Sequence, residues 1–534
     1  MLASFFAKLR AGHGQPYRRL CTQLAALVIA CGVAAPVAAE TVLRTRLNSD
    51  ILSSDPGTRR DENTDAVILH VVEGLVASRE NGSVGPLLAE SWTVSQGGRT
   101  YTFKLRQGVV FHNGAPLTAD DVVWSLRRYL KPETRWRCRL EFAKDGIAQI
   151  LSITAPNPQT VIITLNRAAP LFLKTLARAD CGGTGILQRA SVGPNGVWRK
   201  PIGTGPFMFG AWQRNQFIDL VRFPRYAALP GPRDGNTGGK HALVDRIRFL
   251  VIPDSSAALT ALERGSLDIL DALAPSDLVL MRGRGDIKLD MAPTLDFYAI
   301  LFQTNDPLLR DARIRRAIAL TLDTAGLTKA VTQGTARPDN SPIPSASPYY
   351  GPTETLRRPD LAAARRLLNE AGYHGQPISL ITNRRYPQMF DIAVLVQAMA
   401  AEAGIDLEIE TLDWASQFAR YGSGSYQAMS FAVSAKLDPS FNFGLLIGDK
   451  TRDPRKVWGS PEAQKLLRQT METDDPRQRQ ALFNTLNTAF MREVPAIILF
   501  NTTHIAAFRA NVTGYKGWPA AQLRLWNVGF SGMR

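Results

Sequence analysis

The 534-residue sequence has few cysteines and histidines, and these few form no recognisable catalytic or metal-binding pattern. Its four cysteines include no C-x-x-C pair, and the histidines beyond residue 39 stand far apart, whereas zinc ligands usually recur at short spacings. The sequence also contains neither G-x-S-x-G nor H-E-x-x-H. We therefore predict no catalytic residue, no metal site and no cofactor.

A glycine-rich stretch at residues 235–240 (GNTGGK) is the nearest approach to a phosphate-binding loop. It is one residue too short, and His241 stands where such a loop has serine or threonine. Prolines precede it, so we expect a flexible loop. An exported enzyme with a clustered acid/base site stays open as an alternative.

The sequence lacks a long apolar run beyond residue 39, which makes it unlike a membrane-spanning chain, for which roughly 20 consecutive apolar residues are needed. Its composition, 45% hydrophobic and 21% charged, is that of a globular protein. A chain of this length exceeds one hydrophobic core, so two or three domains are expected.

Residues 1–39 differ from the rest because they contain basic residues but no acid, and then an apolar run that ends in small residues. This pattern predicts a secretory signal peptide cleaved after Ala39 and a periplasmic protein. A retained membrane anchor is one alternative. Another is lipidation of Cys31, since Val28–Cys31 resembles a lipobox. Arg18 and Arg19 fit a twin-arginine signal poorly.

Only Cys138 and Cys181 remain after removal of the predicted signal. Two thiols in an oxidising compartment favour one disulfide, and two buried free thiols are the alternative. Loss of the signal lowers the formal charge from +16 to +12. The basic residues are scattered rather than gathered into a stripe, which predicts a solvated basic surface and no nucleic-acid partner.

Hydrophobic periodicity predicts strands and helices in alternation along most of the chain. The expected strands are 41–47, 101–105, 247–252, 267–270, 378–381, 407–412 and 496–500. The expected helices are 65–75, 255–265, 310–325, 360–371, 391–403, 480–491 and one capped by Thr118 with Asp121. Strand–helix–strand order predicts parallel pairing in two α/β regions, one on each side of about residue 290.

Several segments resemble the family 5 extracellular solute-binding proteins, which include the periplasmic dipeptide- and oligopeptide-binding proteins of ABC importers. The most specific are residues 87–92 (LLAESW), 100–106 (TYTFKLR) and 108–123 (GVVFHNGAPLTADDVV). Residues 202–207 (IGTGPF), 251–269 and 305–318 match further blocks. The resemblance covers essentially the whole chain after the signal.

This resemblance implies a two-lobed periplasmic binding protein fold of the α/β class (type II-like, cluster C), with an extra domain inserted in the first lobe. Lobe I is expected at 40–75, 200–290 and 496–534, the extra domain at 76–199, and lobe II at 291–495. A ligand is then enclosed between lobes that close by a hinge. The expected function is that of a monomeric binding protein that delivers a peptide or related solute to a membrane permease.

The resemblance also bears on the ligand. Peptide-binding members hold the peptide's α-ammonium with a carboxylate three residues before an Asp-Pro pair. Here the pair is Asp438-Pro439, and the matching position is Ala435, so this counter-charge is missing. Another acid substitutes for it, or the ligand is a sugar, an opine, a metal chelate or an anionic compound. Lys436 is then either a partner for an anion or a surface lysine.

Other cleft residues are expected from family position and from strand ends. The full set of predicted ligand-binding residues is Asn48, Asp50, Tyr298, Phe302, Gln303, Thr304, Trp414, Ser434, Ala435 and Lys436. An interaction protein, such as a chaperone with an oversized apolar cleft, is the remaining alternative function.

Overall fold

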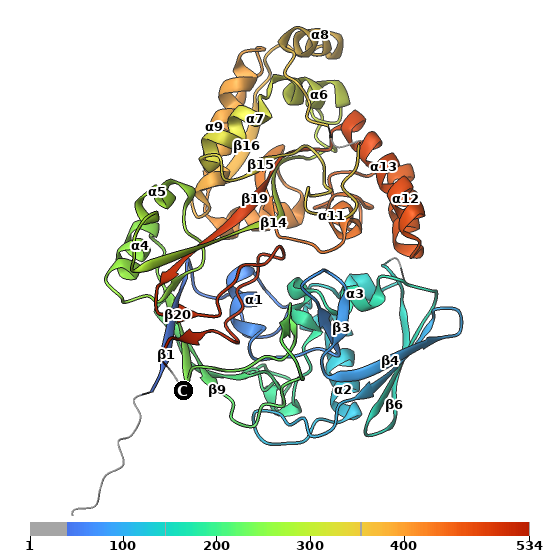
Figure 1. Ribbon diagram of the computed structural model, residues 1–534. Helices are drawn as coiled ribbons and strands as arrows, with labels where there is room; N and C mark the ends of the chain where they lie inside the picture. The colour runs from blue at the N-terminus through green and yellow to red at the C-terminus, as the bar shows by residue number, and fades with distance from the viewer. Residues whose placement is uncertain (1–39, 145, 353–354, 533–534) are drawn as a thin grey trace, which may run out of the picture. The chain divides into compact units, whose positions relative to one another are not determined.

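The computed structural model describes residues 40–144, 146–352 and 355–532 (Figure 1). The predicted signal peptide at 1–39, including Cys31, lies outside these residues. The packing of the chain defines one compact unit that begins at Val42.

A mixed sheet of 11 strands dominates the described part of the chain. Its strands follow one another in the order β17-β16-β18-β14-β19-β13-β1-β12-β9-β8, and β15 pairs with β19. Their bounds are β1 (Val42–Leu47), β8 (Phe207–Gln213), β9 (Phe217–Arg222), β12 (Arg246–Val251), β13 (Ile269–Leu270), β14 (Ile287–Phe302), β15 (Arg337–Pro338), β16 (Ile378–Asn383), β17 (Leu407–Leu412), β18 (Ala428–Val433) and β19 (Ala496–Arg509).

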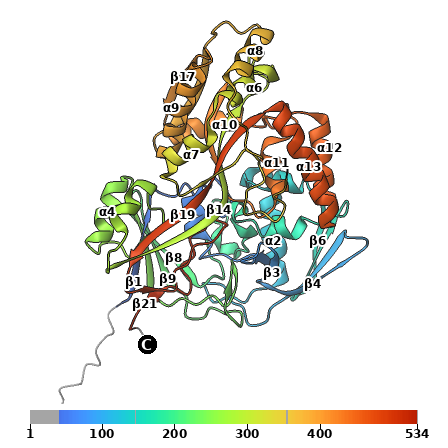
Figure 2. The ribbon, with the colours of Figure 1, turned by 45° about the horizontal axis from the view of Figure 1, so that its top comes forward.

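Two long antiparallel strands, β14 and β19, join the halves of this sheet and run side by side in both views (Figures 1 and 2). One half of the sheet joins the end of β19 through β13, and the other half joins the end of β14 through β18. The register shifts between Pro293 and Phe297, so Thr294, Leu295 and Asp296 form an irregularity at the crossing. Such bulges re-aim side chains.

The predicted parallel units are confirmed. β12 and β13 both pair in parallel with β1, and the helix α4 (Ser255–Glu263) connects them. In the other half, β16 pairs in parallel with β17, and α9 (Pro387–Ala401) connects them. Strand–helix–strand periodicity therefore located both units correctly.

Most helices begin at an aspartate whose side chain accepts a backbone N–H of the first turn, which satisfies one of the donors that a helix start leaves unpaired. The predicted helix at 360–371 is confirmed, with Asp360 at its N-cap and Gly372 at its C-cap. The remaining helices are α1 (Glu62–Ile68), α2 (Ala119–Leu130), α3 (Phe172–Leu176), α5 (Leu278–Met281), α6 (Ala312–Thr321), α7 (Thr324–Thr332), α8 (Leu361–Ala371), α10 (Trp414–Ser423), α11 (Pro439–Leu446), α12 (Pro461–Glu472) and α13 (Pro476–Glu493).

A smaller antiparallel sheet, in the order β4-β5-β7-β6, lies in the region that carries the family-like segments. Its strands are β4 (Ala89–Ser95), β5 (Thr100–Leu105), β6 (Ile150–Asn157) and β7 (Thr160–Leu165). The helix α2 packs beside it and starts with the predicted capping box, in which Asp121 accepts the backbone N–H and the hydroxyl of Thr118. Thr118 and Asp121 are therefore scaffold residues.

The predicted helix at 65–75 is wrong in its bounds. The helix α1 starts at Glu62 and ends at Ile68, and the chain then continues as a buried non-helical segment. Its carbonyl groups accept from other parts of the chain, because Phe207 donates to His70, Gly205 to Val71 and Ile186 to Glu73. The apolar residues at this spacing are indeed buried, but beyond Ile68 they belong to a non-helical segment. Its backbone groups form hydrogen bonds with distant parts of the chain instead of with each other.

The predicted flexible loop at 235–240 is also wrong. The strands β10 (Arg233–Asp234) and β11 (Thr237–Gly238) form a tight hairpin there. Lys240 is 1% exposed and its Nζ lies 2.8 Å from a carboxylate oxygen of the equally buried Glu73. The lysine that resembled a phosphate ligand is thus a partner in a buried ion pair.

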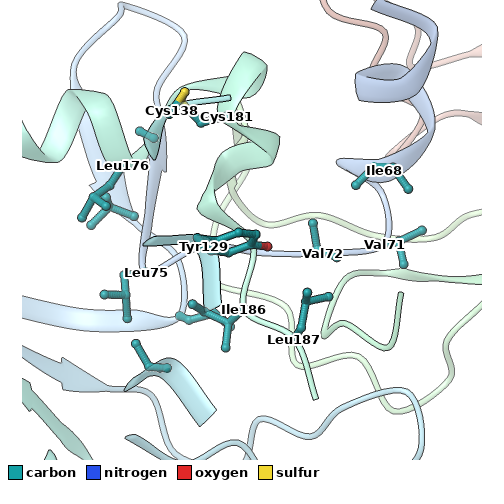
Figure 3. Packing of buried hydrophobic residues seen from close by; sticks show 14 of the residues in the cluster. Ile68, Val71, Val72, Leu75, Tyr129, Cys138, Leu176, Cys181, Ile186 and Leu187 are labelled. Carbon is teal, nitrogen blue, oxygen red and sulfur yellow. A yellow bond between two sulfur atoms is a disulfide. The ribbon is translucent and has the colours of Figure 1, made fainter. Parts of the chain in front are cut away.

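Hydrophobic clusters follow the halves of the sheet. One cluster gathers residues of 43–269 with residues of 508–528, and two others gather residues of 297–500. Figure 3 shows part of the first, which includes Val72, Tyr129, Leu187 and the disulfide between Cys138 and Cys181. These clusters accord with the expected lobes, whose boundaries stay a prediction.

Candidate functional site

Two adjoining cavities lie at the crossing of β14, and both are lined by Asp296. The first has a volume of about 230 Å³ and the second about 130 Å³. We call them together the cleft. Residues from α1 and from 518–523 line one side of the first cavity, and residues 434–437 line the other. Five residues border both cavities: Arg60, Glu62, Asp296, Ser434 and Lys436.

Two carboxylates in the cleft, those of Glu62 and Asp296, form no ion pair with any described residue. Glu62 accepts a hydrogen bond from the hydroxyl of Ser434 at 3.2 Å. Asp296 accepts from the hydroxyls of Thr294 and Thr502, the latter at 2.7 Å. Hydroxyl donors orient a carboxylate without neutralising it, and the longer-range attraction of His504 offsets the charge of Asp296 only in part, so this corner of the cleft favours a positive group.

The bulge in β14 positions Asp296. The residue leaves the β14–β19 ladder where the register shifts, so its side chain enters the cleft rather than the core. Burial raises the pKa of Asp296 to about 6, and the hydrogen bond from Thr502 opposes this rise while the Glu62 charge adds to it. Asp296 thus titrates just below neutral pH.

The cations that line the cleft, in contrast, have acceptors within the protein. Arg60 pairs with Asp65, and Arg46 donates to the carbonyl oxygens of Ile252 and Pro253. A second group surrounds Asp180: Arg178 at 2.8 Å, Lys436 at 3.2 Å and Arg137 at 3.5 Å. Burial lowers the pKa of Lys436 to about 8, with Asp180 opposing that shift and the neighbouring arginines adding to it.

The second cavity has an aromatic wall from the half of the sheet that contains β16–β18. The ring centroid of Trp414 lies 5.0 Å from that of Tyr386, in an edge-on arrangement, and 6.1 Å from that of Phe431, in a stacked arrangement. The other aromatic residues that line it are Tyr298, Phe418 and Tyr421. An apolar or aromatic group fits this wall.

Several polar contacts cross the cleft. Arg385 lies 3.1 Å from Asp61, Lys436 lies 3.2 Å from Asp180, and Lys174 lies 3.0 Å from Asp438. Asp438 is also the N-cap of α11 and pairs with Arg479 at 2.6 Å. In this structure, therefore, the two sides of the cleft are closed against each other.

His504 and Asp271 form a further pair in the first cavity, 3.4 Å apart. Burial opposes the charged imidazole, but the Asp271 carboxylate outweighs it and raises the pKa of His504. Among residues 40–144, 146–352 and 355–532, no group of three or more His, Cys, Asp or Glu side chains is arranged to hold a metal ion.

The family model described as bacterial extracellular solute-binding proteins, family 5 Middle, matches residues 83–454, well over half of the chain. The chain belongs to this family. As a member of this family it is an extracellular solute-binding protein, and it has the two-lobed α/β fold of the family's solved structures.

Relatives of this family 5 protein span nearly its full length. It is 26% identical over 533 residues to a dipeptide-binding protein of Escherichia coli, covering 94% of this chain and 96% of that one. Solved structures of similar proteins share its fold, among them two with bound ligands. A periplasmic binding protein of Helicobacter pylori in complex with the peptide STSA has a TM-score of 0.82 at 24% identity, with coverage of 92% and 98%. The protein AgaA of A. tumefaciens R10, in complex with agropinic acid, has a TM-score of 0.81 at 24% identity, with coverage of 92% and 99%.

The structure brings six of the ten predicted ligand-binding residues of the family 5 protein to the cleft. They are Asn48, Ser434, Ala435 and Lys436 in the first cavity, and Tyr298 and Trp414 in the second, which Ser434 and Lys436 also border. Lys436 is 7% exposed, so it is not a surface lysine.

The other four do not line these two cavities. Asp50 accepts from the indole N–H of Trp212 and from the backbone of Asn215. Phe302 is a core residue, 1% exposed. Gln303 and Thr304 donate to the carbonyl oxygens of Pro454 and Val457. Strand-end position alone did not distinguish these structural roles from contact with a ligand.

Sequence reasoning did not find Glu62, Asp296, Arg137 or Asp180. Glu62 follows an N-cap aspartate and resembles any first-turn acid. Asp296 reaches the cleft only because β14 changes register, and no local pattern shows that. The cysteines adjacent to Arg137 and Asp180 were a usable signal, because a disulfide places both flanking residues together.

Proposed function

We propose that the protein captures a short peptide, or a peptide-like zwitterion, by its free ammonium group and delivers it to the permease of an ABC importer. One observation carries the proposal: Glu62 and Asp296 line both cavities and form no salt bridge with a described residue, while Ala435 lacks the carboxylate of peptide-binding relatives. An ammonium group supplies the missing counter-charge. The aromatic wall accommodates an apolar side chain beside it.

We further propose that the protein is a monomer of the periplasm and has no enzymatic activity. The signal-like residues 1–39 support export, with cleavage after Ala39 or, alternatively, lipidation of Cys31. Within the described residues, no helix combines the length and apolar character needed to cross a membrane. The mass of the mature protein distinguishes the two processing routes, and light scattering gives its oligomeric state.

The expected lobes at 40–75, 200–290 and 496–534, and at 291–495, with the extra domain at 76–199, remain part of this proposal. The separate hydrophobic clusters and the ladder of β14 with β19 support them. A hinge at the β14 bulge lets the lobes close over the ligand. Small-angle scattering tests this closure, and the expected result is a smaller radius of gyration for the ligand-bound protein than for the ligand-free protein.

The test is a thermal-shift screen of protein that has been unfolded and refolded to remove bound ligand. The panel contains dipeptides and tripeptides, their N-acetyl derivatives, sugars and opines. A ligand present at 100 times its Kd stabilises the folded state by about 2.7 kcal/mol. We expect shifts with free peptides that N-acetylation abolishes. Shifts only with compounds that have no ammonium group contradict the proposal.

A further inference from the structure

The disulfide between Cys138 and Cys181 brings two charged residues into contact at the cleft. Arg137 precedes Cys138 and Asp180 precedes Cys181, and the Cα atoms of the two cysteines are 5.5 Å apart. The backbone N–H of Arg137 donates to the carbonyl oxygen of Gly57 at 2.9 Å, which fixes this segment further. The backbone of Arg137 is thus held in place by covalent and main-chain constraints at the edge of the cleft.

Arg137 faces cavities rather than protein. It lines the second cavity of the cleft and also a third cavity of about 610 Å³ between residues 137–178 and 441–471. Its Nε lies 3.5 Å from Asp180, and its two terminal nitrogens donate to no side chain or carbonyl of the described chain. The part of the guanidinium that forms forked hydrogen bonds is therefore available at the cavity wall.

The charges around Asp180 do not balance. Arg178 forms a two-pronged contact with Asp180 at 3.0 and 2.8 Å, and it has a second acid, Glu141, at 3.0 Å. Lys436 and Arg137 have only the same Asp180 carboxylate as their acid. One buried carboxylate is thus shared by three cations, and the excess positive charge lies on the side of Arg137 and Lys436.

Arginine suits an anionic partner of a particular shape. Its planar fork matches the two oxygens of a carboxylate, and such charge-assisted pairs are among the stronger hydrogen bonds in proteins. Burial lowers the pKa of Arg137, and Asp180 opposes that shift while Arg455 and Arg60 add to it. An additional negative charge at this point relieves the mutual repulsion of these cations.

We propose that Arg137, with Lys436 beside it, binds a carboxylate of the ligand from the second cavity. This inference rests on the proposed function and adds the other end of the ligand to it. The cleft then recognises an amphoteric solute: its ammonium lies at Glu62 and Asp296, its apolar side chain at Trp414, and its carboxylate at Arg137. Short peptides with a free C-terminus have this arrangement of groups.

The experiment measures, by isothermal titration calorimetry, the dissociation constants of four forms of Ala-Phe. They are the free dipeptide, its C-terminal amide, its N-acetyl derivative, and the derivative blocked at both ends. Loss of a charge-assisted hydrogen bond corresponds to about a 10- to 100-fold loss of affinity. We expect amidation to weaken binding to the wild-type protein by that factor. In Arg137→Gln the free dipeptide and its amide bind alike, and in Arg137→Lys part of the difference returns.

Arg139→Gln is the matched control, because Arg139 flanks the same cysteine but lines none of the cavities described above. It is expected to keep the full preference for the free carboxylate. If amidation costs nothing in the wild-type protein while N-acetylation does, the carboxylate site is overturned and the ammonium proposal stands. The reverse pattern supports the carboxylate site and overturns the ammonium proposal. Binding of none of the four forms overturns both.

Discussion

Lys436 reaches across the cleft to Asp180, with 3.2 Å between its Nζ and a carboxylate oxygen, and both side chains are about 95% buried. The pair joins the loop before α11 to the segment held by the disulfide. It acts together with the contacts of Arg385 with Asp61 and of Lys174 with Asp438. The protein's own charges thus contribute to the closed arrangement of the lobes.

Lys436→Met is expected to favour the open arrangement in the absence of ligand. Asp180 retains Arg178, so the acid is not left unpaired and the protein still folds. Small-angle scattering should show a larger radius of gyration for ligand-free Lys436→Met than for the wild type. Lys288→Met, at an exposed position of β14, serves as the control and should leave the radius unchanged. Equal radii in all three proteins would contradict a role for this pair in closure.

Trp414→Leu is expected to reduce the preference for peptides with an aromatic side chain. Aromatic contacts contribute about 1 kcal/mol beyond the area they bury, which corresponds to about a fivefold change in Kd. Titration with Ala-Phe and Ala-Ala should show that the variant loses affinity for the first and little for the second. A matching loss for both peptides would place Trp414 in the scaffold rather than at the ligand.

Ligand affinity is expected to fall as the pH drops through about 6. Asp296 has its pKa raised to about 6, and only its ionised form attracts an ammonium group. Affinity for a free dipeptide should be highest near pH 7 and weaken by up to about tenfold per pH unit below 6, and above about pH 7.7 it also falls because the peptide's own α-amino group loses its proton. Titrations from pH 5 to 8 measure this, and Asp296→Asn should remove the dependence.

The stability of the ligand-free protein should follow the opposite trend for this group. Because the pKa of Asp296 is raised in the folded state, its contribution is fully present below the ordinary pKa of an aspartate and is lost as the pH rises through about 6. The unfolding free energy of the wild type, measured relative to that of Asp296→Asn, should therefore fall as the pH rises from the ordinary pKa of an aspartate to about 6. A difference that does not depend on pH contradicts the burial of this carboxylate.

Reduction of the disulfide, or the double change Cys138→Ser and Cys181→Ser, should lower stability by about 4 kcal/mol. The cysteines are 43 residues apart, and the estimate follows from the entropy of closing a loop of that length in the unfolded chain. Urea unfolding with and without reductant measures it. The double variant should be insensitive to reductant, and a wild type equally insensitive would contradict the bond.

Local patterns predicted what depends on neighbouring residues. The alternation of Tyr101 and Phe103 with polar residues identifies β5, and Asp360 and Gly372 identify the ends of α8. Both signals are local, because a strand face and a helix cap depend on residues close together in the sequence. Residues of the cleft could be predicted only where the sequence aligns with a ligand-binding segment of the family, as at Ser434 and Lys436.

The acids of the site could not be predicted in this way. Asp296 depends on the register shift between β14 and a strand about 200 residues later, and Glu62 depends on which side of the fold α1 presents to residues 434–436. The same limit explains the wrong helix at 65–75, where hydrogen bonds from Gly205 and Phe207 override a helical spacing. Long-range pairing decides these features.

Capture of the ligand by its ammonium group at Asp296 is the central claim, and one cycle of titrations tests it most directly. Ala-Phe and N-acetyl-Ala-Phe are each titrated into the wild-type protein, into Asp296→Asn, and into Asp406→Asn, an exposed aspartate remote from both cavities. We predict that N-acetylation weakens binding about 10- to 100-fold in the wild type and in Asp406→Asn, but by a clearly smaller factor in Asp296→Asn, which keeps only Glu62. The same penalty for N-acetylation in all three proteins would contradict the claim.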